Sequence, residues 1–165
     1  MKATFALSIF AITLYAGSAG ASNKLEFEAE LSGAQGVPAI DTRTRGEASF
    51  EVNDDYTKIE YELKVKTRGE SGIGLLGVAG THIHCAPAGE NGPVVAHLAG
   101  VVNGGLDGTF KISATLTEAN IVNDACGATI ASLVNSMSSG LTYVNVHSLA
   151  NPSGEVRGQI VSDDD

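Results

Sequence analysis

Basic side chains are scarce in this sequence. It has 10 Lys and Arg against 19 Asp and Glu, so the formal net charge is −9 at pH 7. Nucleic acids and anionic membrane surfaces are polyanions, which a chain of this charge repels. The balance therefore argues against both as partners. The three aspartates at 163–165 are expected to form a solvated tail.

Several sequence motifs of enzymes are absent. There is no Gly-x-Ser-x-Gly segment, which would present the nucleophile of an α/β-hydrolase. The Gly-rich segment 69–80 lacks the Gly-x-x-x-x-Gly-Lys spacing of a phosphate-binding loop. Asn53, Asp54 and Asp55 lack the spaced oxygen ligands of a calcium loop, and a turn accounts for them. The motifs therefore give no support to hydrolase, nucleotide or calcium chemistry.

Only the start of the chain contains a long apolar run. Lys2 precedes the apolar residues 3–16, and Ala19-Gly20-Ala21 follows them. A basic residue, an apolar run and an Ala-x-Ala site are the parts of a secretory signal peptide, which we predict over residues 1–21. The run is too short for a membrane anchor. We expect residues 22–165 to form one secreted or periplasmic domain that keeps no anchor.

Cysteine is limited to Cys85 and Cys126. Export implies an oxidising compartment, and two cysteines allow only one pairing, so we predict an intramolecular disulfide. The alternative is that the Cys85 thiolate is a copper ligand. In an extended strand, however, Cys85 faces away from His82 and His84.

Strict alternation of apolar and polar residues runs through most of the chain. Leu25, Phe27, Ala29 and Leu31 alternate with glutamates, which is typical of a half-buried strand. Similar short strands, separated by turn residues, follow until the end. This pattern predicts an all-β fold, an immunoglobulin-like or superoxide-dismutase-like antiparallel β-sandwich or barrel.

One segment departs from the strand pattern. Ile130, Leu133, Val134 and Met137 recur at helical spacing, and Thr129 can cap the first turn. We predict a short inserted helix over roughly 129–138 that covers one end of the core.

The four histidines fall on predicted strands. His82 and His84 are two apart, so their side chains share one face of a strand. His147 lies on the outward face of a later strand, and His97 follows the Gly/Pro-rich loop after Cys85. If the strands that carry His84 and His147 are neighbours, three imidazoles converge on the outside of the sheet.

A cluster of histidines without carboxylates suits copper, with zinc as the alternative. We predict metal ligation by His82, His84 and His147, with His97 as an optional fourth ligand. Arg157, Glu155, Tyr143 and Asn145 are the candidates for a supporting shell, because they share the outward face. The alternative is that the histidines merely form hydrogen bonds to Tyr143, Asn145 or Glu155.

Three blocks of sequence carry a resemblance to a known family. Residues 81–94 (THIHCAPAGENGPV), 143–148 (YVNVHS) and 154–160 (GEVRGQI) resemble the CHRD domain, named for chordin and common in exported bacterial proteins. The resemblance extends from about Lys24 to Val161. It implies an immunoglobulin-like or barrel-like β fold. It leaves the function open, because the family is defined largely by sequence: animal members are linked to growth-factor binding, and most bacterial members are uncharacterised.

A second similarity is to the copper site of copper/zinc superoxide dismutases. That family also has His-x-His on a strand, a third histidine after a loop, a fourth in a later Val-rich strand and a late arginine. His82, His84, His97, His147 and Arg157 follow this order. The residues of the zinc site and the electrostatic loop are not evident. The similarity therefore implies a copper pocket and does not imply dismutase activity.

Two functions follow from these observations. The first is copper handling, or redox chemistry at an open coordination position, in an exported protein. The second is a non-enzymatic module that binds an extracellular protein or glycan and in which the histidines are structural.

Overall fold

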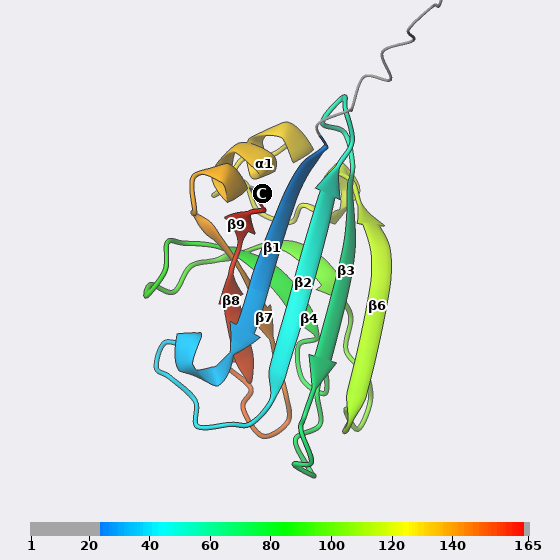
Figure 1. Cartoon of the computed structure of the whole chain (residues 1–165), viewed down its shortest axis with the longest axis vertical. Coiled ribbons are helices and arrows are strands. Elements are labelled where there is room, and N and C mark those ends of the chain that lie inside the picture. The colour runs from blue at the N-terminus through cyan, green and yellow to red at the C-terminus, as the bar shows by residue number, and fades with distance from the viewer. Residues whose placement is uncertain (1–23, 164–165) are drawn as a thin grey trace, which may run out of the picture.

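An antiparallel sheet curls into a nearly closed barrel in this computed structural model (Figure 1). The structure describes residues 24–163, and the predicted signal peptide lies outside them. Within this range the strand order is β5-β4-β7-β8-β1-β2-β3-β6, with β9 pairing with β1. The elements are β1 (Leu25–Ser32), η1 (Gly33–Gln35), β2 (Arg45–Val52), β3 (Ile59–Lys66), β4 (Thr81–Cys85), β5 (Val94–Ala99), β6 (Thr109–Leu116), η2 (Glu118–Asn120), α1 (Ile130–Ser138), β7 (Thr142–Val146), β8 (Val156–Gln159) and β9 (Val161–Ser162).

Strands β1, β2, β3 and β6 form one wall of the barrel, and β4 and β7 pass behind it (Figure 1). The register places Phe27 opposite Phe50, and Phe50 opposite Tyr61, so the apolar residues of three strands meet on one face. The intervening glutamates and lysines point outward. The predicted all-β antiparallel fold is confirmed, and the alternation is the physical cause of its two faces.

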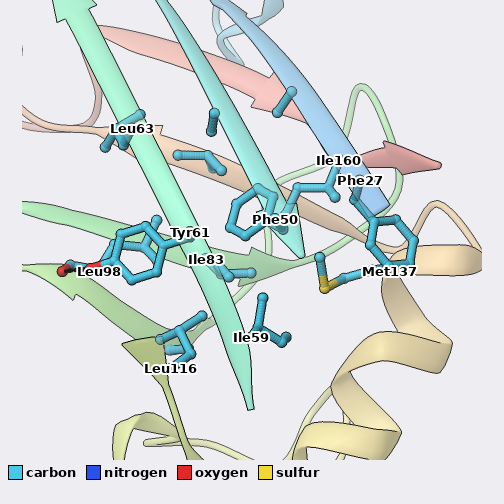
Figure 2. Packing of buried hydrophobic residues seen from close by; sticks show 14 of the residues in the cluster. Phe27, Phe50, Ile59, Tyr61, Leu63, Ile83, Leu98, Leu116, Met137 and Ile160 are labelled. Carbon is cyan, nitrogen blue, oxygen red and sulfur yellow. Dashed lines mark hydrogen bonds between the residues drawn. The ribbon is translucent and has the colours of Figure 1, made fainter. Parts of the chain in front are cut away.

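The barrel interior is filled by apolar side chains from every wall (Figure 2). Phe27, Phe50 and Leu63 are at most 2 % exposed. Ile83 of β4 is fully buried in this core. Because neighbouring residues of a strand point to opposite faces, the two residues that flank Ile83 face away from the core.

Helix α1 packs against one end of the barrel (Figure 1). Its residues Ile130, Leu133, Val134 and Met137 are buried. The Thr129 hydroxyl accepts a hydrogen bond from the Ser132 backbone N–H, so one free N–H group at the start of the helix is satisfied. The predicted helix over 129–138 is confirmed.

A disulfide joins Cys85 to Cys126, as predicted, with 5.7 Å between their Cα atoms. It attaches the segment before α1 to the end of β4. The Tyr61 hydroxyl donates a hydrogen bond to the Leu98 carbonyl and links β3 to β5. In the part of the chain that the structure describes, no helix has the length and hydropathy that a membrane crossing requires.

Candidate metal centre

Three histidines converge where β4 and β7 lie side by side. The pairing of the two strands places His82 opposite Asn145 and His84 opposite Tyr143, and His147 directly follows the end of β7. One ring nitrogen of each histidine, His82, His84 and His147, lies within 4.8 Å of the others. Strand β4 ends at Cys85 and β7 begins at Thr142, so the cluster depends on the pairing of two strands that are distant in the sequence.

The cluster is buried, which differs from the expected solvent-facing patch. His82 is 6 % exposed, and His84 and His147 are each 8 % exposed. Contacts with the two loops 86–93 and 147–155 account for this, because their backbone groups bond to the side chains of this face. The alternation correctly separates the face from the barrel core, but it cannot show that loops cover it.

His84 has one ring nitrogen committed and one free. Its Nδ1 lies 3.0 Å from the Gly92 carbonyl oxygen. A carbonyl only accepts, so Nδ1 carries the proton and donates it, and Nε2 must carry the lone pair. That Nε2 atom is buried and has no hydrogen-bond partner. A buried acceptor without a partner is costly, and a ligand at this position would relieve the cost.

His147 is oriented in the same way. Its Nδ1 donates to the Pro152 carbonyl oxygen at 2.9 Å, which leaves the lone pair on Nε2. This Nε2 lies 3.3 Å from Nδ1 of His82 and 3.5 Å from Nδ2 of Asn145. Without a metal, His82 Nδ1–H therefore donates to His147. For His82 to bind a metal through Nδ1, its proton must move to Nε2.

Burial and mutual repulsion favour the neutral forms of His82 and His84, because they lower the pKa of both side chains. Desolvation, with smaller contributions from His147, His97 and His84, lowers the pKa of His82 to about 4. Desolvation also lowers the pKa of His84, against the opposing hydrogen bond to Gly92. Neutral imidazole is the form that binds metals. His82 and His84 are therefore in the form that could bind a metal at neutral pH.

His97 lies on the other side of His82. Strand β5 pairs with β4 opposite to β7, and the register sets His97 directly across from His82. The ring centroids of these two histidines are 4.8 Å apart. His97 is exposed and does not belong to the group of three nitrogens. It lies at the solvent side of the cluster.

Tyr143 and Arg157 form a stack beside the cluster. The rings of His84 and Tyr143 are nearly parallel, with centroids 4.8 Å apart. The Arg157 guanidinium carbon lies 3.5 Å from the Tyr143 ring centroid, a cation–π contact. Burial lowers the pKa of Arg157, and Tyr143 opposes this effect. Tyr143 therefore contacts His84 directly, and Arg157 contacts Tyr143.

Glu155 stabilises the turn after His147, whereas Asn145 contacts the histidine cluster itself. Glu155 is fully buried, and its carboxylate accepts hydrogen bonds from Ser148 and Asn151 of the same turn and from Thr42. It holds the turn that follows His147, and its hydrogen bonds go to that turn and to Thr42 rather than to an imidazole. Asn145 does approach the cluster, through the contact of its Nδ2 atom with His147.

Sequence reasoning missed the two residues that orient the imidazoles. Gly92 and Pro152 act through backbone carbonyl oxygens, which every residue has, so no side-chain pattern marks them. A Cβ on Gly154 would lie 2.4 Å from the Asn145 side-chain oxygen, so Gly154 allows Asn145 to sit beside His147. The Gly and Pro residues clustered in both loops were the only sequence feature that could have indicated tight turns beside the histidines.

Fold and site together define an all-β barrel protein with a buried group of three histidines that could hold a metal ion. The family model of the CHRD domain matches residues 27–160, and the chain belongs to this family. A search of the curated proteins found no match. The similarity to the copper site of superoxide dismutases gains no support from these comparisons and depends on the order of the histidines alone.

Proposed function

We propose that this protein binds one copper ion through His82, His84 and His147, for copper handling or for redox chemistry at an open coordination position. The observation that carries the proposal is the unpartnered Nε2 atom of His84, which is buried inside a cluster of imidazoles. Its Nδ1 atom is already bound to a backbone carbonyl.

The hydrogen bonds of His84 and His147 support this proposal. Metal-binding histidines commonly donate their second ring N–H to a carbonyl or carboxylate, which fixes the ring and the tautomer. His84 makes such a bond to Gly92, and His147 makes one to Pro152. Two of the three ligands are thus held in place before any metal binds.

Copper is favoured because the cluster offers nitrogen alone. Glu155 forms its hydrogen bonds elsewhere, and both cysteines are in the disulfide, so within residues 24–163 no carboxylate or thiolate joins the three imidazoles. Imidazole suits copper and zinc, and copper has the higher affinity for a given nitrogen site. Zinc is the alternative, with water completing four ligands.

The test is copper titration of the oxidised, untagged protein over residues 22–165. Wild type is expected to bind one copper ion, and Cu(II) should give an electron paramagnetic resonance spectrum of nitrogen ligation. His84→Ala removes the free Nε2 and is expected to weaken binding at least 100-fold. His97→Gln is the matched control, because it removes an exposed histidine outside the group of three and should keep the stoichiometry.

Equal affinity and stoichiometry in wild type and His84→Ala would overturn the proposal. In that case the rival is the non-enzymatic module for an extracellular protein or glycan. Competition with zinc in the same titration decides between the two metals.

Export to an oxidising compartment, secreted or periplasmic, is part of the proposal. The Cys85–Cys126 disulfide supports it, because such bonds persist mainly outside the cytosol. The predicted signal peptide gives the route. Fractionation of cells that express the full chain, with the mature N-terminus determined by mass spectrometry, tests cleavage after Ala21.

A further inference from the structure

Strand β6 is an open edge of the barrel. It stands at one end of the strand order, beside β3 (Figure 1). Within residues 24–163, no segment other than β3 forms a backbone hydrogen bond with β6. One side of this eight-residue strand therefore presents unpaired N–H and C=O groups, which are a template for the addition of another strand.

The strand at the other end of the order, β5, is covered. The Val122 N–H donates to the Val95 carbonyl at 2.9 Å, and Ile121 forms an isolated bridge with β5. The Tyr61 hydroxyl donates to the Leu98 carbonyl. These contacts satisfy edge groups of β5 that another strand could otherwise bind. Because β5 and β6 are not paired with one another, β6 has no such cover in the described residues.

Strand β6 has few of the features that protect edge strands from pairing. It pairs with β3 without a bulge, and it contains neither Pro nor Gly. Lys111 is its only charged residue, and Glu62 of β3 holds it in a salt bridge at 2.8 Å. Ala114 is exposed, although it shares a face of the strand with the buried Phe110. Solvent therefore reaches this edge from the core side as well as from the outer side.

The sequence of β6 is complementary to itself in antiparallel order. Consider two copies that meet with Ser113 opposite Ser113. Every pair on the core side is then apolar: Phe110 with Leu116, and Ile112 with Ala114. On the outer side, Lys111 lies opposite Thr115. This register therefore avoids like charges directly opposite one another, which would lower stability.

The charges on the outer face of the sheet support the same register. The pairing of β2, β3 and β6 places Glu51, Glu60 and Thr115 in one row. It places Lys64 beside Lys111 in another row. When Thr115 of one copy lies opposite Lys111 of the second copy, the acidic row of each copy continues into the basic row of the other. This attraction opposes the repulsion between two chains that each have a formal net charge of −9.

We propose that two copies of this chain pair along β6, antiparallel and about a two-fold axis at Ser113, so that their sheets continue into one another. Main-chain hydrogen bonds form the contact, and the apolar pairs and the charge rows fix its register. An edge of eight residues buries less surface than a standard interface, so the dimer is weak and depends on protein concentration. The histidine cluster lies on β4 and at the end of β7 and takes no part.

Sedimentation equilibrium of the metal-free protein, at about 0.15 M salt, measures this association. The apparent mass is expected to rise with protein concentration from that of the monomer toward twice that value. Ser113→Asp places two like charges opposite one another at the two-fold axis and should keep the protein monomeric. Ser49→Asp is the matched control and should keep the dimer, because it adds the same charge at an exposed position of the same sheet face, on β2.

A crosslink tests the register of the two strands. Residues directly opposite one another in an antiparallel pair have Cβ atoms about 5 Å apart, which is close enough for a disulfide after a small shift. In oxidised glutathione, Ser113→Cys should therefore form a covalent dimer, and Ser49→Cys should stay monomeric.

Three results would overturn the proposal. The first is a monomeric mass of wild type at every concentration, which would leave the edge of β6 for a strand of another protein. The second is a dimer that Ser113→Asp does not weaken, and the third is equal crosslinking of the two cysteine variants. Because the protein is free of metal, none of these results bears on copper binding.

Discussion

At the scale of single residues, the three imidazoles of the cluster differ in how they are held. His84 and His147 each donate Nδ1–H to a loop carbonyl, whereas His82 donates to His147. Two rings thus have one tautomer imposed by the backbone, and the third adapts. Burial lowers the pKa of His82 and His84, because a proton on either ring would add a charge that is cut off from water.

The lowered pKa of His82 predicts a loss of stability in mild acid. An unfolded histidine titrates near 6.5 and folded His82 near 4, so the unfolded state binds more protons between these values. Stability is then fully present above pH 6.5 and decreases as the pH falls toward 4. Between pH 7 and pH 5 the free energy of unfolding of the metal-free protein should decrease by about 2 kcal/mol.

Urea unfolding of metal-free protein at pH 7 and pH 5 measures this decrease. His82→Gln should reduce the dependence, because it removes one of the two histidines whose pKa burial lowers, while His84 remains. If the pH dependence of stability were the same in His82→Gln as in wild type, the lowered pKa of His82 would not be its cause.

A substitution at Gly154 tests whether the position of Asn145 matters for the histidine cluster. Its φ is 139°, and an added Cβ would lie 2.4 Å from the Asn145 oxygen. Gly154→Ala should lower the free energy of unfolding by about 2 kcal/mol and should weaken copper binding, because Asn145 is displaced beside His147. Gly89→Ala is the control, since Gly89 also has positive φ (82°) but open space around its Cβ position. Equal costs in both variants would mean that backbone strain alone matters.

At the scale of elements, loops and turns convert an outer sheet face into an enclosed site. All five residues of β7 are buried, although only alternate ones face the barrel core. The Gly/Pro-rich loop after β4 and the turn before β8 supply the cover. Helix α1 closes a different end of the barrel and takes no part in the site.

The hydrogen bond from the Ser132 N–H to the Thr129 hydroxyl should contribute to the stability of the protein. Thr129→Ala removes the acceptor for the Ser132 N–H and should lower the free energy of unfolding by about 1 kcal/mol. Ser138→Ala, at an exposed position of the same helix, should leave stability unchanged or slightly higher. Chemical denaturation of both variants gives the comparison, and equal effects would argue against the cap.

We expect the disulfide between β4 and the segment before α1 to stabilise the fold more than the Thr129 cap does. Cys85 and Cys126 are 41 residues apart, so the chain-entropy relation gives a stabilisation of about 3 to 4 kcal/mol. The double variant Cys85→Ser/Cys126→Ser should unfold at correspondingly lower denaturant. Reducing agent should shift wild type to the same midpoint and leave the variant unaffected. A shift in the variant would indicate another cause.

At the scale of the whole molecule, the ligands connect strands that are distant in the sequence. A metal held by His82, His84 and His147, as proposed, would bind the folded barrel more tightly than the unfolded chain. Copper at 100 times its dissociation constant should therefore add about 2.7 kcal/mol to stability and raise the unfolding midpoint by roughly 5 to 10 °C. Differential scanning calorimetry with and without copper measures this. His84→Ala should show no such increase, and an equal rise in that variant would place the metal elsewhere.

Local patterns in the sequence were sufficient to predict the strands and the helix. Alternation of apolar and charged residues separates the two faces of β1, β2 and β3, and helical spacing with a threonine cap marks α1. Two cysteines permit only one intramolecular bond. Residue parity also put His82 and His84 on one face. Each of these depends on neighbours within a few residues, or on counting, so no knowledge of strand order is needed.

The tertiary structure alone decided what the histidines contact. Strand order places β7 and β5 on opposite sides of β4, so His147 joins His82 and His84 while His97 lies toward solvent. The fold of two loops buries the face and aims two carbonyl oxygens at the rings. It also turns Glu155 toward Thr42 and Ser148. These outcomes depend on pairings between residues far apart in the chain, which the period of a single strand does not encode.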